Sequence, residues 1–322
     1  MYKKSCVKII KKSKIYIAGH NGMVGSAIFR MLKEKGFNNI ATRASSELDL
    51  RDCIAVRTFF EKEKPEYVFL AAAKVGGIKV NMQYPVDFLY DNLMIQNNII
   101  YQSYKTGIKK LIFLGSSCIY PKDCPQPMKE EYLMTGPLEP TNEGYALAKI
   151  AGLRLVQYCN KQHGLNCLNS MPCNLYGTND SFDPNNSHVL AALVRKFVDA
   201  TDENKKEVVL WGRGIARREF MNVDDLAQAL LFLIEKWDSP EIINVGSGAD
   251  ISIKELAELI ANKVKYTGKI VWDTSMPDGM LRKCLDVSKL HSLGFCSSIA
   301  LEDGIDQVIN EYRSLKLKGV TK

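Results

Sequence analysis

The sequence predicts an α/β protein in which a doubly wound parallel sheet is followed by a smaller C-terminal α/β region. Strand-like and helix-like segments alternate from residue 14 to about residue 175. This pattern is typical of a parallel sheet with helices on both faces. A glycine-rich turn separates the first strand from the first helix, at the place where such sheets bind nucleotides.

The individual elements follow from their apolar patterns. Short apolar runs such as "YVFL" and "LIFL" fit buried strands, whereas apolar residues three and four positions apart fit helices. The expected strands cover residues 14–18, 39–42, 67–72, 109–114 and 166–174, and the expected helices cover residues 22–35, 52–64, 86–105 and 144–159.

The regular alternation ends near residue 175, where a loop rich in Asn, Asp, Ser and Pro precedes a helix expected over residues 188–199. We therefore expect a cofactor-binding domain over residues 14–175 and a smaller substrate-binding domain over residues 176–322. Residues 1–13 form a basic extension. Later segments, between residues 207 and 264, fit either layer.

The composition narrows the class of protein. The formal charge is +7, but residues 1–14 carry six lysines and no acid, so the rest is close to neutral and does not fit a nucleic-acid partner. No apolar run approaches the roughly 18 residues of a membrane span. The nine cysteines form no C-x-x-C pair and the four histidines form no H-E-x-x-H cluster, so we expect no metal and a cytoplasmic protein.

The glycine turn "IAGHNGMVG" places Gly19, Gly22 and Gly25 directly after a strand and at the start of a helix. Glycines let the backbone approach a pyrophosphate, and the helix N-terminus supplies free N–H groups. The alternative is a tight turn that only packs.

The end of the second strand indicates which dinucleotide binds. An NAD site has Asp or Glu there to hold the ribose hydroxyls, but this sequence has Arg43. A guanidinium suits a 2′-phosphate, so NADP(H) is the expected cofactor, the alternative being a solvated surface arginine. Asp49 either meets the adenine edge or caps the helix that begins near Asp52.

Tyr145 and Lys149 form a Y-x-x-x-K pair on one face of the predicted helix. We expect the ammonium to lower the tyrosine pKa and to hydrogen-bond a nicotinamide ribose. Together with Ser116 after the fourth strand, the pair would bring a hydroxyl, a phenol and an amine to the nicotinamide.

With these motifs the chain resembles the extended short-chain dehydrogenase/reductase superfamily and its Rossmann fold. Within it, the chain is most similar to the GDP-L-fucose synthase family, whose NADPH-dependent members are 3,5-epimerases and 4-reductases of GDP-4-keto-6-deoxymannose. The resemblance runs from about residue 14 to residue 286, through "AGHNGMVGSAI", "LAAAKVGGI", "LGSSCIYP", "EPTNEGYALAKIAG", "MPCNLYG", "NSHVLAALVRKF", "WGRGIARREFMNVDD", "NVGSG" and "PDGMLRKCLDV".

The resemblance implies that Cys118 and His188 exchange protons at carbons 3 and 5, beside the 4-ketone. Ser116 and Tyr145 would hold the ketone oxygen, and Tyr145 would later protonate it. Which of Cys118 and His188 serves each carbon stays open. From the residues alone, Cys118 would be a buried structural thiol and His188 a helix cap or surface residue.

The resemblance also implies the binding residues. A GDP-sugar would be contacted by Lys196, Trp211, Arg218 and Asp278, although in isolation Trp211 fits a core position. Residues 74–77 would lie beside the cofactor or the sugar. The cofactor set comprises Gly19, His20, Asn21, Gly22, Met23, Val24, Gly25, Arg43, Asp49, Leu50, Leu114, Gly115, Ser116, Ser117, Tyr145, Lys149, Pro172, Cys173, Asn174, Leu175 and His188.

Three positions depart from the family pattern: Ser45 stands where a further arginine is expected, Gly144 where proline is common and Lys196 where arginine is usual. Rival activities are a UDP-sugar 4-epimerase, a 4,6-dehydratase or a non-catalytic dinucleotide sensor. The Tyr145–Lys149 pair argues against the sensor, and Cys118 argues against the other two. The superfamily implies a homodimer through residues 86–105 and 145–160, although those apolar faces also fit a monomer core.

Overall fold

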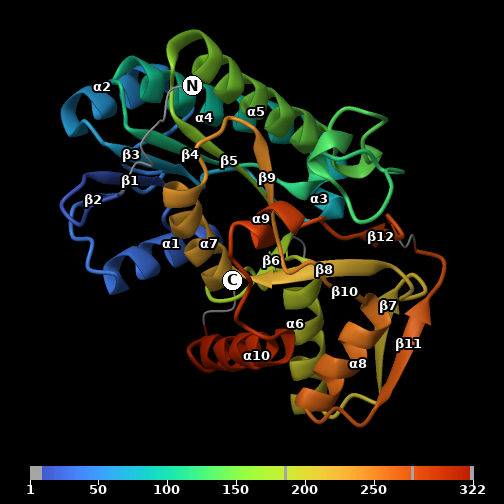
Figure 1. The fold of residues 1–322 in the computed structure, drawn as a ribbon. Helices are drawn as coiled ribbons and strands as arrows, with labels where there is room; N and C mark the ends of the chain where they lie inside the picture. Colours follow the sequence, from blue (N-terminus) through green and yellow to red (C-terminus); the bar gives the residue numbers. More distant parts are fainter. Residues whose placement is uncertain (1–8, 185–186, 277–278, 320–322) are drawn as a thin grey trace.

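Six parallel strands form the central sheet of the computed structural model, which describes residues 9–184, 187–276 and 279–319 (Figure 1). Their order in the sheet is β2-β1-β3-β4-β5-β9. The strands are β1 (Ile15–Ala18), β2 (Ile40–Ala41), β3 (Tyr67–Leu70), β4 (Lys110–Leu114), β5 (Cys167–Pro172) and β9 (Ile242–Val245).

The chain order reverses between β1 and β3, which are neighbours in the sheet although β2 separates them in the sequence. In doubly wound sheets a ligand crevice opens at this reversal, beyond the carboxyl ends of the strands. The loops that follow β1 and β3 therefore border the expected cofactor site.

Helices cover both faces of the sheet (Figure 1). The helices α4 (Pro85–Lys105) and α5 (Glu143–His163) pack against each other on one face, with α2 (Cys53–Glu63) beside α4. On the opposite face, α1 (Met23–Glu34) packs against α7 (Val223–Lys236).

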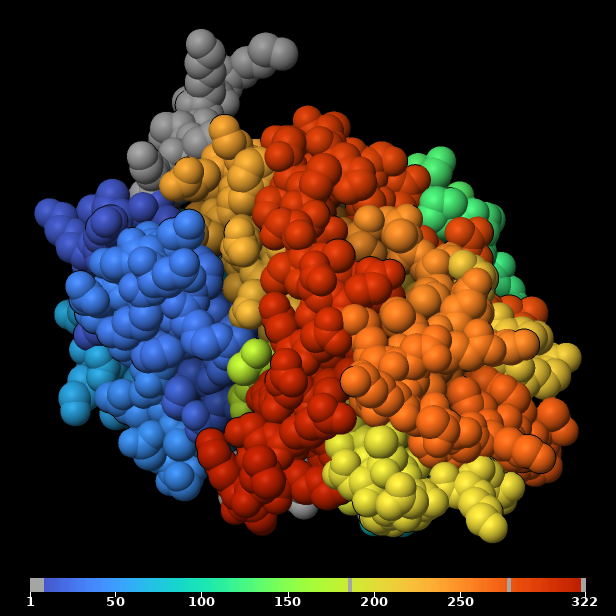
Figure 2. Space-filling model, turned by 90° about the horizontal axis from the view of Figure 1, so that it is seen from below, coloured from blue at the N-terminus to red at the C-terminus, as the bar shows by residue number. Residues whose placement is uncertain are grey.

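The second part of the molecule contains two small sheets. β8 (Arg217–Asn222) pairs with β6 (Asn174–Tyr176), β10 (Asp250–Ser252) and β12 (Arg282–Lys283), and β7 (Glu207–Trp211) pairs with β11 (Lys269–Asp273). The helices of this part are α6 (Val189–Asp202), α8 (Ile253–Lys263) and α10 (Leu301–Leu317). In Figure 2 the red C-terminal chain runs between the blue N-terminal part and the orange segments.

Short helical elements connect these parts. They are α3 (Ile78–Gln83), α9 (Ser288–Ser292) and the 3₁₀ turns Ser117–Ile119, Glu130–Tyr132 and Pro140–Asn142.

The buried side chains form two cores that are not continuous in sequence. The first core surrounds the six-stranded sheet and includes residues of α7 and β9, as well as Leu285, Val287 and Leu290. The second core lies among α6, α8 and α10. We propose that residues 14–175 form the cofactor domain together with these returning segments, and that the remainder of residues 176–322 forms the smaller domain.

The predicted fold class is confirmed: a parallel sheet with flanking helices is followed by a smaller α/β part. The expected strands and helices up to residue 199 are present, with ends that differ by a few residues. The helices α3, α9 and α10 were not predicted. Within the described residues, no helix is long and apolar enough to cross a membrane.

Lys110 links the sheet to the end of α7. This fully buried ammonium donates to the Ile234 carbonyl at 3.0 Å and to the Trp237 carbonyl at 2.6 Å. Replacing it with methionine leaves both carbonyls without this donor, so we expect Lys110→Met to lower the free energy of unfolding by about 1–3 kcal/mol.

Chemical denaturation measures this loss, and Lys109→Met is the matched control. Lys109 is half-exposed and pairs with Glu66 at the surface, where an ion pair contributes about 0–1 kcal/mol. Equal losses in the two variants would contradict the structural role of Lys110.

Candidate functional site

The glycine turn closes tightly between β1 and α1. Gly19 has φ +88°, and a side chain at Gly25 would come within 2.1 Å of the Gly19 carbonyl oxygen. No side chain caps the first N–H groups of α1 at Gly22. The turn therefore exposes helix N–H groups to the crevice, as a pyrophosphate requires.

A cavity of about 580 Å³ adjoins this turn. Gly22 and Met23 line one side, Lys74 lies on another, and Asp180 and His188 come from the second part of the chain. Residues from both parts thus enclose one space. Asp180 Oδ2 is buried and, within the described residues, has no hydrogen-bond partner. Burial raises its carboxyl pKa to about 7.

Asn179 connects the second part of the chain to the glycine turn. Its side-chain amide donates to the Asn21 carbonyl at 2.8 Å and to Ser26 Oγ at 3.3 Å. Its own backbone N–H donates to Glu311 at 2.8 Å. Because Glu311 lies on α10, the C-terminal helix and the glycine turn are held by one residue.

Lys149 lies at the centre of the predicted catalytic group. Its side chain is buried, its Nζ donates to the Leu114 carbonyl at 2.8 Å, and burial lowers its pKa to about 8. The same Nζ lies 5.7 Å from the centre of the Tyr145 ring. The structure therefore brings Tyr145 and Lys149 together on α5, as the Y-x-x-x-K spacing predicts.

The expected electrostatic effect of Lys149 on Tyr145 is wrong. Burial raises the pKa of Tyr145 well above its usual value, the charge of Cys118 raises it further, and only a hydrogen bond with Ser116 lowers it. The phenol thus stays protonated at neutral pH. This is the state needed to donate a proton rather than to accept one.

Cys118 is surrounded by hydrogen-bond donors and a cation. The Lys283 ammonium lies 3.3 Å from its Sγ, and the Asn142 amide donates to the same sulfur at 3.2 Å. Burial raises the pKa of Cys118, but the charge of Lys283 and hydrogen bonds with Ser116, Lys283 and Asn142 outweigh it, so the pKa lies below its usual value. This is the setting of a reactive thiol rather than of an inert structural one.

His188 begins α6 without capping it through its side chain. Its imidazole lines the 580 Å³ cavity, where the surrounding protein lowers the pKa and the charge of Lys283 lowers it further. The imidazole is therefore neutral at neutral pH. The charge of Lys283 lowers the pKa of both Cys118 and His188. The two predicted proton-transfer groups thus share one neighbouring cation.

The remaining predicted cofactor residues lie at the carboxyl ends of β4 and β5. Ser116 Oγ accepts the Cys118 N–H at 3.2 Å and begins the 3₁₀ turn that carries the thiol. Leu114, Ser117 and Cys173 are buried, and Pro172, Asn174 and Leu175 follow on β5 and β6.

The predicted cofactor residues that follow β2 form contacts with other side chains of the protein. Arg43 binds Glu63 at 2.7 Å and stacks over the Phe59 ring at 5.4 Å. Asp49 accepts from Arg51. The helix cap considered for Asp49 belongs to Asp52, whose carboxylate accepts from Ile54 and Ala55, so that alternative is wrong.

Three of the predicted substrate residues, Lys196, Trp211 and Arg218, lie in the second part of the chain, on α6, β7 and β8. Trp211 is 59% exposed, so the alternative of a core tryptophan is wrong. Lys196 Nζ donates to the Val209 carbonyl at 3.1 Å. Burial lowers the pKa of Arg218, while the charges of Glu139 and Cys118 oppose this effect. Asp278 lies outside the described residues.

Three functional residues were missed by sequence reasoning. Asn142 and Lys283 contact the Cys118 sulfur, and Glu139 begins the 3₁₀ turn that carries Asn142. Asn142 and Glu139 stand directly before Tyr145 in "EPTNEGYALAK", and Lys283 stands in "LRKC". Both segments belong to those that carry the family resemblance. Neither their residue types nor their spacing indicates contact with a cysteine that is distant in sequence.

Glu219 holds the segment that carries Lys283. Its buried carboxylate accepts the Leu285 N–H at 2.8 Å and the Gly248 N–H at 2.7 Å. Burial raises the pKa of Glu219 to about 7 against these hydrogen bonds. This carboxylate thus adds to the backbone pairing of β12 with β8 in holding the segment that carries Lys283.

Comparisons with known proteins match nearly the whole chain. Residues 15–246 match the model of the NAD dependent epimerase/dehydratase family. The chain is 55% identical to a putative GDP-L-fucose synthase 2 of Arabidopsis thaliana, over 94% of this chain and 92% of that protein. It is 50% identical to the GDP-L-fucose synthase of Escherichia coli K12, over 92% of this chain and 95% of that protein.

The fold also matches a solved structure over nearly the whole chain. A GDP-L-fucose synthetase from Naegleria fowleri, bound to NADP, superposes with a TM-score of 0.90 at 28% sequence identity. The match covers 98% of each chain.

Removing the cation beside Cys118 tests the electrostatics of the site. We expect Lys283→Met to raise the pKa of Cys118 and to slow its alkylation by iodoacetamide at pH 7.5 about three- to tenfold, because less thiolate is present. Mass spectrometry of the Cys118 peptide across pH 6–10 measures the rate at this thiol alone.

Lys254→Met, at an exposed position of α8, is the matched control and should leave the alkylation rate unchanged. An identical alkylation profile in Lys283→Met and the wild type would show that Lys283 does not set the protonation of Cys118.

Proposed function

Because the chain belongs to the NAD dependent epimerase/dehydratase family and, within it, to the GDP-L-fucose synthases, we propose that this site makes GDP-L-fucose. The substrate is GDP-4-keto-6-deoxy-D-mannose, which is epimerised at carbons 3 and 5 and then reduced at carbon 4 with NADPH. The observation that carries the proposal is Cys118 beside Lys283, in the same site as Ser116, Tyr145 and Lys149.

The residues of the crevice fit a dinucleotide. The glycine turn leaves the N–H groups of α1 open for the pyrophosphate, and His20 Nδ1 is buried without a partner in the described structure. In this proposal Lys149 holds the nicotinamide ribose, and Asn174 and Leu175 line the nicotinamide pocket. When bound, NADPH supplies the hydride that reduces carbon 4.

The epimerisation uses the acidity of the C–H bonds beside the ketone. Ser116 and Tyr145 hold the oxygen at carbon 4 by hydrogen bonds, so the negative charge that forms there as a proton leaves carbon 3 or 5 is stabilised. The lowered pKa of Cys118 makes its thiolate more accessible than that of an ordinary cysteine, and the lowered pKa of His188 favours its neutral imidazole. Each group is able to accept a proton and to return one.

The reduction uses the same oxygen site. Tyr145 is protonated at neutral pH because burial raises its pKa, so its phenol donates the proton to the oxygen as carbon 4 is reduced. Lys149 lies close to the Tyr145 ring and has a pKa of about 8, near neutrality. It therefore returns a proton to the Tyr145 oxygen after that oxygen has given up its own. One set of residues therefore serves both chemical stages.

The nucleotide part of the substrate lies toward the smaller domain. In this proposal Arg218 and Lys196 neutralise the diphosphate, and the exposed indole of Trp211 covers the base or sugar. Asp278 completes this set in the proposal.

Deuterium incorporation tests the two stages separately. In deuterated water with NADPH, we expect the wild type to give GDP-L-fucose labelled at carbons 3 and 5. Cys118→Ser should lose about 10²- to 10⁴-fold in the exchange rate, because a proton-transfer group is removed. Tyr145→Phe should lose reduction more than exchange. Mass spectrometry and NMR of the product give both rates.

Cys296→Ser is the control for the cysteine variant, since Cys296 is an exposed thiol between α9 and α10. No turnover of the GDP-sugar by the wild type would overturn the substrate assignment. Full exchange in Cys118→Ser would leave Cys118 without a role in epimerisation.

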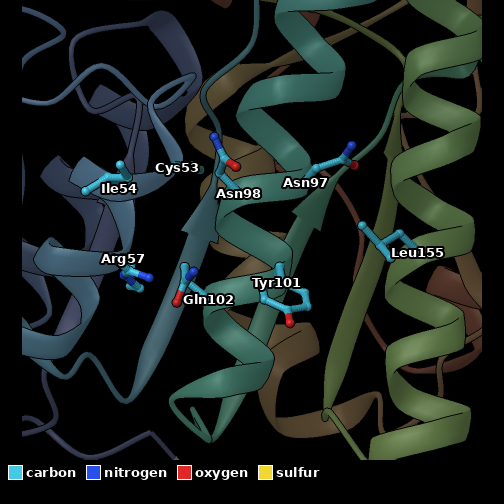
Figure 3. Close-up of a pocket in the computed structure, with 8 residues that line it drawn as sticks. All are labelled: Cys53, Ile54, Arg57, Asn97, Asn98, Tyr101, Gln102 and Leu155. Atoms are coloured by element: carbon cyan, nitrogen blue, oxygen red, sulfur yellow. The ribbon is translucent and has the colours of Figure 1, made fainter.

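We also propose a homodimer formed through α4 and α5. Large apolar side chains on these helices are exposed: Tyr90 at 59%, Tyr101 at 49%, Leu147 at 44% and Tyr158 at 61%. A hollow of about 370 Å³ lies between α2, α4 and α5, with Tyr101 and Leu155 in its wall (Figure 3). Exposed apolar area of this kind favours a partner surface over a solvated face.

Sedimentation equilibrium tests the dimer. We expect the wild type to be a dimer at micromolar concentration and Tyr158→Lys to shift it toward monomer, because a buried unpaired charge at the interface is costly. Leu317→Lys, at a 90% exposed position of α10, is the control. A monomeric wild type would rule the interface out.

The proposed compartment is the cytoplasm. All eight cysteines of the described residues are free, which supports a reducing environment, and fractionation of the source cells checks it.

A further inference from the structure

A buried asparagine on the edge strand β9 joins two segments that are far apart in sequence. Asn244 is fully buried, and its side-chain amide donates to the Met128 carbonyl at 2.9 Å and to the Asp286 carbonyl at 3.0 Å. The two segments also bind each other, since the Asp286 N–H donates to the Met128 carbonyl at 2.8 Å. Asn244 therefore holds the chain around Met128 against the chain that follows β12.

The oxygen of the same amide binds the segment that carries the thiol. Asn244 Oδ1 accepts the Tyr120 O–H at 2.5 Å, and Tyr120 directly follows the 3₁₀ turn Ser117–Ile119. Burial raises the pKa of the Tyr120 phenol well above its usual value, so the phenol keeps its proton and is the donor. Carbonyl groups only accept hydrogen bonds, so the amide nitrogen must face the two carbonyls and its oxygen must face Tyr120.

These hydrogen bonds reach both partners of the contact between thiol and ammonium. Cys118 lies two residues before Tyr120 in the sequence. Lys283 lies three residues before Asp286. The 3.3 Å separation of the Lys283 Nζ and the Cys118 Sγ thus joins two chain segments that both bind Asn244. A buried amide whose hydrogen bonds are all made is costly to displace, so it keeps these segments together.

A carboxylate supports the asparagine through its backbone. Glu130 Oε1 accepts the Asn244 N–H at 3.1 Å, and Glu130 Oε2 binds the Lys289 ammonium at 3.3 Å. Lys289 lies on α9, which packs beside β9 (Figure 1). Because α9 follows the segment that carries Lys283, the same network also holds the chain beyond this lysine.

The hydroxyl of the site has a separate support. Ser116 is next to Gly115, whose N–H donates to the Ser170 carbonyl of β5 at 2.9 Å. Ser116 is thus positioned from the central sheet, whereas the turn with Cys118 is held at its far end through Tyr120. Loss of the Tyr120 hydrogen bond should therefore displace the thiol more than the serine.

We propose that Tyr120 and Asn244 are positioning residues for the epimerisation, because they hold the Cys118 thiol beside the Lys283 ammonium. Both side chains are buried and act through the thiol. This inference rests on the proposed function and deepens it, since it assigns to one stage of the reaction two residues that are remote from the reacting carbons.

The protonation of Cys118 tests the inference without any sugar nucleotide. Tyr120→Phe removes only the O–H that binds Asn244, and Asn244→Leu removes the amide at similar size. We expect the midpoint of Cys118 alkylation by iodoacetamide to rise by about 0.3–1 pH unit in Tyr120→Phe, and further in Asn244→Leu, because the ammonium is held less firmly beside the sulfur. Mass spectrometry of the Cys118 peptide across pH 6–10 measures the midpoint. A site that is only more open would change the rate at high pH and leave the midpoint where it is.

The other charged groups around the thiol stay the same in these variants. Lys283 acts on Cys118, and the charge of Cys118 acts in turn on Tyr145 and Arg218. None of these residues is substituted, so a shifted midpoint reports a change in their positions relative to the sulfur.

Tyr312→Phe is the matched control. Tyr312 is an equally buried tyrosine on α10, and its O–H donates to the Asp199 carboxylate at 3.0 Å. This variant also loses one buried hydrogen bond of a tyrosine, but it should leave the Cys118 midpoint unchanged. Melting temperatures of all variants separate a general loss of stability from a displaced thiol.

Turnover shows which stage depends on the two positioning residues. In deuterated water, the exchange rate at carbons 3 and 5 should fall about three- to tenfold in Tyr120→Phe. The reverse of the reduction needs no epimerisation: carbon 4 of GDP-L-fucose gives a hydride to NADP⁺ and its hydroxyl gives up a proton. The rate of this oxidation should change less than about twofold.

Two outcomes would overturn the inference. The first is a Cys118 midpoint that stays unchanged in Tyr120→Phe and in Asn244→Leu. The second is an equal loss of exchange and of reverse oxidation, which would mean a general disturbance of the site. Because the alkylation profile needs no GDP-sugar, an absence of turnover by the wild type would overturn the proposed function, whereas an unshifted midpoint would overturn this inference alone.

Discussion

The buried carboxylate of Glu219 is the interaction on which the arrangement of the site depends. It sits on β8, whose neighbouring side chains Phe220 and Met221 belong to the second and the first core. By accepting N–H groups from Gly248 and Leu285, it fixes two segments that come from far along the sequence. Hydrogen bonds to a buried carboxylate are expensive to lose, so these segments are strongly held.

Burial shifts the pKa values of the titratable groups of the site in opposite directions. Taking charge out of water raises the pKa of the Tyr145 phenol and lowers the pKa of the Lys149 ammonium. Cys118 would follow the phenol, but the cation at 3.3 Å reverses the direction. One site therefore holds a phenol whose pKa is raised and a thiol whose pKa is lowered.

Much of the fold was predictable because its signals are local. The glycine turn, the apolar strands and the Y-x-x-x-K helix are each encoded within fewer than about 20 residues, and the family membership inferred from them is confirmed. Lys283 and Asn142 were not predictable, since their roles arise from contacts with Cys118 across 165 and 24 residues of sequence. The expected lowering of the Tyr145 pKa by Lys149 was wrong for a related reason. The Y-x-x-x-K spacing indicates that the two side chains are close, but burial determines the direction of the pKa shift.

The path of the chain between the two cores has a consequence for engineering. β9 and residues 285–290 return to the first core after the chain has built most of the second, and Asn179 ties the second part to the glycine turn. The smaller domain therefore cannot be exchanged as a separate unit. A chimera that exchanges everything after residue 175 for the equivalent part of another enzyme would also exchange β9, an edge strand of the six-stranded sheet, and Lys283, whose ammonium lies beside Cys118. Single substitutions within the second part therefore disturb the sheet of the first part less than an exchange of the whole segment does.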